Sequence, residues 1–106
     1  MKVQFNPSSL HGTIPAIPSK SASHRALICA ALASGRSTIG NLMLSEDILA
    51  TIDCLTALGA KITVNADTAI VEGVGDCQWQ KEKQALLNCR ESGSTLRFLI
   101  PIAAAL

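Results

Sequence analysis

The chain has 106 residues, of which 48% are hydrophobic but only 3% aromatic, and its formal net charge is +1. This length provides for one domain or a piece of one, with a core that must be built from Ala, Leu, Ile and Val. The near-neutral charge argues against a nucleic-acid partner, and the late apolar run from Phe98 to Leu106 is too short to span a bilayer, so we expect no membrane association.

The first residues predict two extended pieces. Met1 to Phe5 alternates apolar and polar residues and predicts a short strand. The stretch from Leu10 to Ile17 predicts a second extended segment, but Gly12 and Pro15 make it an edge strand or an irregular crossing.

Two helices and a strand follow. A helix is expected over Ser21 to Ala33, with Ser19 or Ser21 as its N-cap and Gly35 just past its end. Residues 37–42 are β-branched at their start and predict a strand. Ser45 then caps a second helix with acidic residues in its first turn, and Gly59 ends it.

The second half predicts a hairpin and a third helix. Strands over 61–65 and 68–72 flank Ala66-Asp67 and predict a β-hairpin. Ala-Asp is not a favoured two-residue turn, so a longer loop between the strands is an alternative. We expect a loop over residues 76–88, with Trp79 as an anchor and a short strand near Ala85 to Cys89. A helix then runs from Gly93 through Leu106 and is kinked at Pro101. The order of elements predicts an α/β (α+β) fold, a βαβαββ unit with both long helices on one face of a small mixed sheet.

The start of the first helix has the composition of an anion site. Lys20, Ser21, Ser23 and Arg25 gather in or just before its first turn. Two cations at the positive end of a helix dipole repel each other unless an anion lies between them, and a phosphate or carboxylate fits there. The alternative is a capped surface helix with solvated charges.

A weaker echo of this pattern begins the third helix, where Ser92 and Ser94 precede Arg97. Gly93 would let a ligand approach the backbone, although a glycine used only for the turn into the helix explains it as well. Ser21 or Ser23 beside His24 does not predict acyl transfer, because neighbours on a helix point apart and no third group is seen to orient the histidine.

No metal or cofactor is expected. The cysteines (Cys29, Cys54, Cys77 and Cys89) form no Cys-x-x-Cys pair and have no metal-ligand spacing with the two histidines. We expect Cys29 and Cys54 to be small buried thiols within helices. No signal segment opens the chain, so a cytoplasmic, reduced protein is expected.

The segment Pro18-Ser19-Lys20-Ser21-Ala22-Ser23-His24-Arg25 resembles the signature near the start of the 5-enolpyruvylshikimate-3-phosphate synthase (3-phosphoshikimate 1-carboxyvinyltransferase) family. In that family a glycine usually follows the proline, and asparagine often stands at the position of His24. The segment Glu91-Ser92-Gly93-Ser94-Thr95-Leu96-Arg97 resembles a second family block, with Glu91 in place of an asparagine. Asn41-Leu42 and Ser45-Glu46-Asp47 resemble two further blocks, in order and at family spacing.

The resemblance implies the reaction and the substrates. The family transfers the enolpyruvyl group of phosphoenolpyruvate to shikimate 3-phosphate, a step of aromatic amino-acid biosynthesis in the shikimate pathway. By matched position, Lys20 would contact phosphoenolpyruvate, Ser21 the 3-phosphate, and Arg25 the ring or carboxylate of shikimate 3-phosphate. Gly93 would line the phosphoenolpyruvate pocket, where glyphosate competes.

Supporting roles are implied for a further set of residues: Ser23, Asp47, Glu91, Ser94 and Arg97. Glu91 would pair with Arg90 or Arg97, or point away. The family's catalytic acid and base groups have no match in this chain, so we expect only part of the substrate site here and no turnover by the chain alone.

The resemblance also implies an N-terminal fragment of a longer enzyme whose remaining chain is its partner. Residues 1–16 would belong to the other domain of that enzyme, residues 17–88 would form the first complete βαβαββ unit, and residues 89–106 would start a second. Two alternatives are a stand-alone phosphate-binding module and a fragment of UDP-N-acetylglucosamine enolpyruvyl transferase. The latter shares the folding unit but lacks the Pro-Ser-Lys-Ser-x-Ser-x-Arg block.

Overall fold

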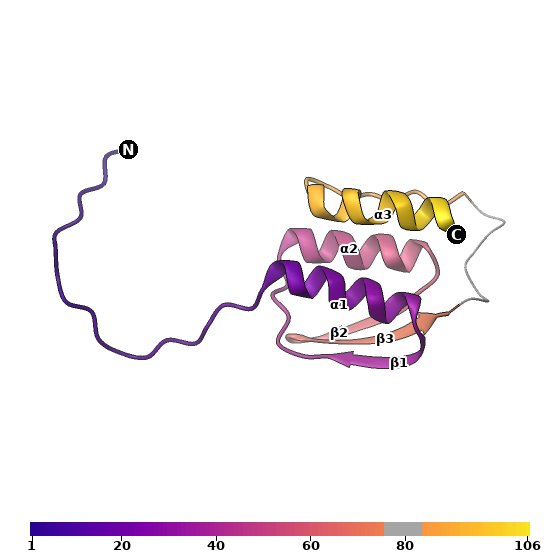
Figure 1. Cartoon of the computed structure of the whole chain (residues 1–106), viewed down its shortest axis with the longest axis horizontal. Helices are drawn as coiled ribbons and strands as arrows, with labels where there is room; N and C mark the ends of the chain where they lie inside the picture. Colours follow the sequence, from indigo (N-terminus) through magenta and orange to yellow (C-terminus); the bar gives the residue numbers. More distant parts are fainter. Residues whose placement is uncertain (76–83) are drawn as a thin grey trace.

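The computed structural model of the chain describes residues 1–75 and 84–106. Its elements, in order, are α1 (Lys20–Leu32), β1 (Ser34–Ile39), α2 (Glu46–Ala57), β2 (Lys61–Asn65), β3 (Thr68–Val74) and α3 (Gly93–Ala105). Figure 1 shows the helices on one side of the sheet, with α1 and α2 packed on it and α3 packed against α2. The mixture of helices with a small sheet agrees with the α+β class.

The sheet has the strand order β1-β3-β2, and both pairings are antiparallel. β1 pairs with β3 from Ser34↔Val74 to Ile39↔Ala69, and β2 pairs with β3 from Lys61↔Glu72 to Asn65↔Thr68. The expectation of a mixed sheet is therefore wrong for the described residues. A mixed sheet needs a parallel strand, and residues 1–19, where two extended segments were expected, pair with no described strand.

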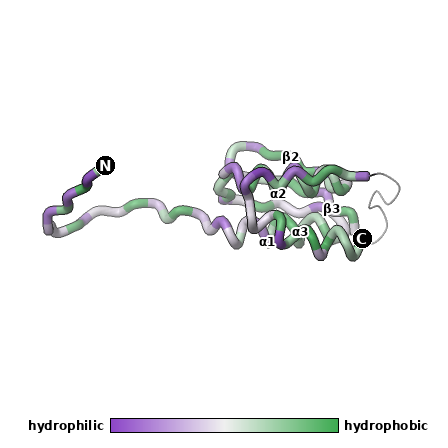
Figure 2. The backbone as a smooth tube through the Cα atoms, turned by 90° about the horizontal axis from the view of Figure 1, so that it is seen from above, coloured by the Kyte–Doolittle hydropathy of each residue, from purple (hydrophilic) through white to green (hydrophobic). Residues whose placement is uncertain are grey.

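Residues 1–19 form an arm that extends away from the packed body (Figure 1). The strands predicted over 1–5 and 10–17 are not formed, because a strand requires a neighbouring edge to receive its backbone hydrogen bonds. Large apolar residues nevertheless recur along the arm, as the green positions in Figure 2 show, and they are exposed: Met1, Val3, Phe5, Leu10, Ile14 and Ile17.

Each end of α1 lies one residue earlier than predicted, and the residue expected to end the helix, Gly35, has another role. Ser19 is the N-cap, with its Oγ accepting a hydrogen bond from the Ala22 backbone N–H at 3.2 Å. The chain passes from Ala33 directly into β1, so Gly35 (φ +90°) lies inside the strand and does not cap the helix. Consequently β1 begins three residues before the predicted strand and ends at Ile39, ahead of the predicted end at residue 42.

The second helix agrees with the prediction at both ends. The Ser45 side chain accepts a hydrogen bond from the Ile48 backbone N–H at 3.4 Å, and Glu46 and Asp47 occupy the first turn. At the other end Leu58 is the C-cap, and Gly59 follows with φ +116°, in the left-handed region that favours glycine.

The hairpin turn contains only the two residues Ala66 and Asp67, because Asn65 pairs with Thr68. Ala66 adopts φ +54°, which a residue with a Cβ rarely does. The short strand expected near Ala85 to Cys89 is absent, since residues 84–89 join no ladder, and Trp79 lies outside the described residues.

α3 begins at Gly93, as predicted, and contains Pro101.

The core lies between the helices and the sheet. Its largest fully buried apolar side chains are Leu27 of α1, Ile48 and Leu55 of α2, Val71 of β3 and Leu99 of α3. α1 approaches β3 so closely that a Cβ at Gly73 would lie 2.0 Å from the Ala33 carbonyl oxygen and 2.4 Å from that of Ala30. Glycine at position 73 is therefore what lets the end of α1 pack directly on the sheet.

A first prediction concerns Leu55, which is fully buried in α2. Leu55→Ala should lower the free energy of unfolding by about 2–5 kcal/mol, because it removes buried methyl groups and leaves a cavity. Leu86→Ala is the matched control: Leu86 is 88% exposed, so the same change should cost less than about 0.5 kcal/mol. Urea titrations of both variants measure the difference. Equal costs would show that Leu55 is not a core residue.

Candidate functional site

The first turns of α1, α2 and α3 meet at one end of the helical layer. Lys20 at the start of α1 contacts Asp47 in the first turn of α2, and Asp47 in turn contacts Thr95 in the first turn of α3. The three helices are therefore aligned with their N-termini together. Because each helix carries partial positive charge at that end, the combined field there favours a negatively charged ligand.

A chain of buried hydrogen bonds joins the second turns of α1 and α2 to the first turn of α3. His24 Nδ1 lies 2.7 Å from Thr51 Oγ1, Thr51 Oγ1 lies 2.7 Å from Thr95 Oγ1, and Thr95 Oγ1 lies 2.6 Å from Ser92 Oγ. Thr95 Oγ1 also lies 3.3 Å from the Asp47 carbonyl oxygen, and the Thr95 backbone N–H donates to Ser92 Oγ at 3.2 Å. All four side chains are buried. We call His24, Thr51, Thr95 and Ser92 the buried polar network.

One arrangement of protons satisfies every one of these contacts. A carbonyl oxygen can only accept, so the Thr95 hydroxyl donates to Asp47, and the hydroxyls of Thr51 and Ser92 then both donate to Thr95 Oγ1. Thr51 must therefore accept from His24, which places the imidazole proton on Nδ1. His24 Nε2 is left as a buried acceptor with no hydrogen-bond partner among the described residues.

Burial governs the charge of this histidine. His24 is 1% exposed, and desolvation lowers its pKa from the ordinary value of 6.5, with the Asp47 carboxylate opposing the shift and Lys20 adding to it. The neutral form is thus favoured, as the single-proton assignment requires. The expectation that no third group orients His24 is wrong, because Thr51 fixes the ring from the neighbouring helix.

Lys20 and Asp47 form an ion pair at the open side of this network. Lys20 Nζ lies 2.6 Å from Asp47 Oδ2, and both side chains are partly exposed. The hydrogen bond from Lys20 lowers the pKa of the Asp47 carboxyl below its ordinary value. The sequence predicts that the cations at the start of α1 repel each other unless an anion lies between them. This expectation needs correction, because the Asp47 carboxylate already supplies a negative charge to Lys20.

The other predicted residues of the first helix divide into two groups. Ser21 and Arg25 are exposed, and Arg25 makes no ion pair with any residue in the described part of the chain. Ser23 is buried, and its hydroxyl donates to the Ser19 carbonyl oxygen at 2.9 Å. Ser23 therefore holds the helix end together and has no hydroxyl directed to solvent.

At the start of α3, Gly93 is exposed, and a Cβ built on it would meet nothing within 4 Å. The surrounding chain therefore does not require glycine for packing. Ser94 is half-buried, and Glu91 and Arg97 are exposed; Glu91 forms no ion pair with Arg90 or Arg97. The pairings expected of Glu91 are therefore not formed among the described residues, and its side chain is exposed just before α3.

Arg90 instead binds α2. Its guanidinium lies 2.6 Å from Glu46 Oε2 and 2.6 Å from Asp53 Oδ2, and its backbone adopts φ +49°. Both ion pairs are solvent-exposed and therefore individually weak. Together they hold the turn that precedes α3 against α2.

Sequence analysis missed Thr51, Thr95 and Arg90. Thr51 carried a usable signal: it is a polar residue on the apolar face of its helix, beside Ile48 and Ile52, and a polar group at a core position requires a partner. Thr95 lies three residues after the N-cap Ser92, where contact with the cap is expected. Arg90 carried no comparable signal.

A hollow of about 270 Å³ lies on another side of the first turn of α1. Ser19, Ala22, Ser23 and Asn41 are among the residues that line it, whereas Lys20, Ser21 and Arg25 do not. The predicted binding residues therefore do not share that hollow. Within residues 1–75 and 84–106 no group of three or more His, Cys, Asp or Glu side chains has the arrangement of a metal site, and no helix is long and apolar enough to cross a membrane.

Comparison with known proteins gives a consistent result. Residues 5–106 match the family model for EPSP synthase (3-phosphoshikimate 1-carboxyvinyltransferase). The chain is 47% identical over 102 residues to the 3-phosphoshikimate 1-carboxyvinyltransferase of Clostridium perfringens strain SM101, and 48% identical over 106 residues to that of Clostridium beijerinckii. It is 43% identical over 110 residues to the Clostridioides difficile protein of the same name.

These alignments cover 96–97% of this chain but only 24–25% of the relatives. The chain thus spans about a quarter of the length of the curated proteins that it matches.

A second prediction follows from the depressed pKa of His24. Because the folded-state pKa lies below the unfolded value of 6.5, the folded protein binds fewer protons than the unfolded chain as the pH falls through this region. The stability is complete above pH 6.5 and should fall below it, by at most about 1.4 kcal/mol per pH unit. Asp47 also has a depressed pKa, but its contribution is lost only below 3.8.

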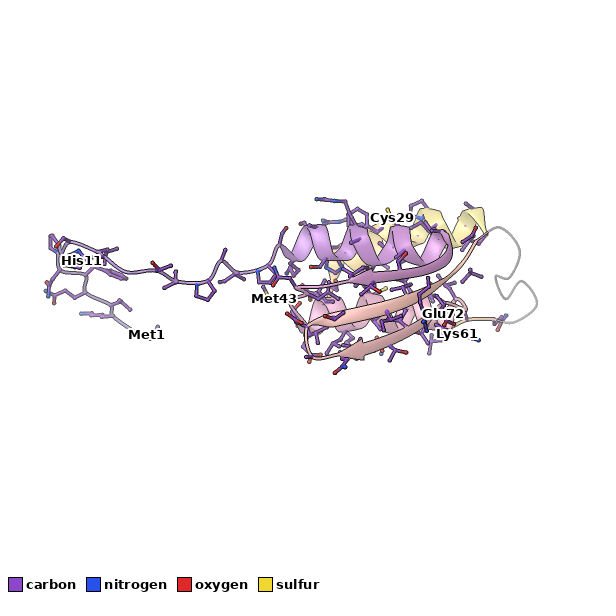
Figure 3. The ribbon with its side chains drawn as sticks, turned by 90° about the horizontal axis from the view of Figure 1, so that it is seen from below. Met1, His11, Cys29, Met43, Lys61 and Glu72 are labelled. Atoms are coloured by element: carbon purple, nitrogen blue, oxygen red, sulfur yellow. The ribbon has the colours of Figure 1, made fainter. Side chains whose placement is uncertain are left out.

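Urea titrations at several pH values between 7 and 4 measure this loss. His24→Gln should make the free energy of unfolding independent of pH above the range in which carboxylates titrate. His11→Gln should leave the pH dependence unchanged, because His11 lies on the arm away from the body (Figure 3). A profile that is already flat in the unmodified chain would contradict the neutral, buried state of His24.

Proposed function

The chain belongs to the EPSP synthase family, and on that premise we propose that it forms part of the substrate-binding site of an enzyme that transfers the enolpyruvyl group of phosphoenolpyruvate to shikimate 3-phosphate. The observation that carries this proposal is the meeting of three helix N-termini beside Lys20, with Arg25 exposed in the second turn of α1. Both proposed substrates are polyanions, so an end of the molecule with aligned dipoles and two cations suits them.

Arg25 is the residue best prepared to bind a carboxylate or phosphate. It is exposed and makes no ion pair with a described residue, and its planar guanidinium can donate two parallel hydrogen bonds to an oxyanion. Ser21, exposed in the first turn of α1, is proposed to donate to the 3-phosphate of shikimate 3-phosphate.

Lys20 is proposed to act as a point charge for phosphoenolpyruvate. In the ligand-free chain it is held by Asp47 at 2.6 Å, so a substrate must share or displace that contact. The ion pair is partly exposed and hence contributes little, so a doubly charged phosphate can compete for Lys20. Asp47 would thus position Lys20 before the substrate arrives.

Gly93 is proposed to lie against phosphoenolpyruvate. Its Cβ position faces open space, which leaves room for a ligand to approach the backbone of the first turn of α3. We further propose supporting roles for Ser94 and Arg97 on the same turn and the next.

The domain assignment is also a proposal. Residues 17–88, whose described part has the order αβαββ without the first strand, would form the first βαβαββ unit of the longer enzyme. Residues 1–16 would belong to its other domain, and residues 89–106 would begin a second unit. The exposed apolar residues of the arm support this, because they are suited to burial against another part of a longer chain. The groups that perform the proton transfers are proposed to lie in that remainder.

A third prediction tests the anion site. Shikimate 3-phosphate should raise the melting temperature of the chain, equivalent to about 2.7 kcal/mol at a hundredfold excess over its dissociation constant. Arg25→Ala should abolish the rise. Arg36→Ala is the matched control, because Arg36 lies beyond the far end of α1 and pairs with Glu72 at 3.3 Å. Thermal unfolding of all three proteins, with and without ligand, measures the effect.

The outcomes separate the alternatives. Loss of the rise in both variants would indicate a diffuse charge effect and no site. An equal rise with inorganic phosphate would favour a general phosphate-binding module over a site that recognises shikimate 3-phosphate.

A further inference from the structure

Two thiols meet on the side of α2 that faces the approach to α3. Cys54 lies in α2 and is buried, Cys89 lies three residues before the N-cap Ser92, and their sulfur atoms are 3.9 Å apart. Both are free cysteines that lie 35 residues apart in the sequence. A disulfide requires sulfur atoms about 2.05 Å apart, so a displacement of about 2 Å, shared between two side chains, closes the gap.

We propose that Cys54 and Cys89 are a modification site, at which a small, uncharged hydroperoxide oxidises the two thiols to a reversible disulfide that fastens α2 to the segment leading into α3. The proposal is independent of the substrate site, because it uses none of the residues assigned there.

The surroundings of Cys89 define the reagent. Cys89 is half-buried and contributes to the wall of a hollow of about 270 Å³, whose other lining residues are all apolar: Leu87, Leu96, Leu99, Ile100 and Ala103. A small uncharged peroxide can enter such a hollow without losing strong hydration, whereas a bulky charged oxidant such as glutathione disulfide cannot.

The two thiols have different parts in the reaction. Burial, reinforced by the neighbouring Cys89, raises the pKa of the Cys54 thiol to about 12, so Cys54 is a poor first nucleophile. Cys89 is the more accessible of the two and attacks the peroxide. Its sulfur bonds to one peroxide oxygen, the O–O bond breaks, and the released alkoxide takes the Cys89 proton and leaves as an alcohol.

The product of that step is a sulfenic acid on Cys89. The Cys54 sulfur then attacks the Cys89 sulfur: an S–S bond forms, the S–O bond breaks, and the hydroxide leaves as water with the Cys54 proton. Each sulfur has lost one electron and the peroxide has gained two, so the reaction balances without a further reagent.

The disulfide would add a covalent link at the turn before α3, whose ion pairs to α2 are exposed and weak. In the reduced chain Arg90 holds the turn before α3 to Glu46 and Asp53 through exposed ion pairs. A covalent link between Cys54 and Cys89 would also close a long loop in the unfolded chain and so restrict its conformations. Oxidation is therefore expected to raise the melting temperature, and reduction to reverse the rise.

The test treats the native 106-residue chain with tert-butyl hydroperoxide, alkylates the remaining thiols with N-ethylmaleimide, and maps the peptides by mass spectrometry. We expect a peptide that joins Cys54 to Cys89 with the loss of two hydrogens, alkylation of Cys29 and Cys77, and a higher melting temperature that dithiothreitol reverses. Cys29 is the internal control: it is exposed on α1 (Figure 3), so the expectation of a buried thiol there is wrong.

Two further experiments distinguish a reaction that depends on the proximity of the two thiols from general thiol reactivity. The same treatment in urea should give mixed pairings, because the fold no longer selects the partners. Cys29→Ser should retain the Cys54–Cys89 peptide, and Cys54→Ser should eliminate it. The proposal would be overturned if Cys54 and Cys89 were fully alkylated in the native chain, or if either of them paired chiefly with Cys77. Both outcomes are measured on the unmodified chain, so they do not depend on whether a variant folds.

Discussion

The buried polar network of His24, Thr51, Thr95 and Ser92 is the interaction on which the arrangement of this molecule depends. It connects one side chain of α1 to one of α2 and then to the first turn of α3 and its cap, through contacts of 2.6–2.7 Å. In a buried setting such groups cannot exchange partners with water, so each contact is costly to leave unmade. The network therefore fixes the positions of three helix starts relative to one another.

This constraint explains why the ionic contacts around it can be weak. The ion pair of Lys20 with Asp47 and those of Arg90 with Glu46 and Asp53 are partly exposed, and each contributes little to stability. These ion pairs can therefore break when a ligand binds or when the neighbouring thiols are oxidised, while the buried polar network stays in place. A site that binds polyanions needs this combination, because its cations must be positioned without being committed to permanent partners.

Much of the fold follows from local chemistry that the sequence displays. Serines at positions 45 and 92 identified the starts of α2 and α3, and Ser19 was one of two candidate caps for α1, because a hydroxyl can satisfy the free N–H groups of a first turn. The alternating segments around Ala66-Asp67 identified the hairpin. The strands predicted in the arm were wrong because strand pairing depends on the tertiary structure. The alternation in residues 1–5 shows which face of a strand would be apolar, but it does not show which sheet edge the strand would pair with.

The site was predictable to a smaller extent. Lys20, Ser21, Arg25 and Gly93 were proposed from charge, helix position and resemblance, and the structure leaves all four exposed or partly exposed around helix starts that lie together. Neither the spacing nor the composition of the sequence could show that Asp47 forms an ion pair with Lys20, that Ser23 is buried or that Thr51 orients the ring of His24. The contacts of Asp47 with Lys20 and of Thr51 with His24 each join residues 27 positions apart, so they depend on how α1 and α2 pack.

The network can be tested most directly by removing its central hydroxyl while keeping the shape of the side chain. Thr51→Val should lower the free energy of unfolding by about 1–3 kcal/mol in a urea titration, because it leaves the buried groups of His24 and Thr95 without their shared partner. Thr56→Val, the same change at an exposed position of α2, should shift it by less than about 0.5 kcal/mol. If the two variants were equally stable, the helix starts would be held by apolar packing alone, and the central role of the network would be contradicted.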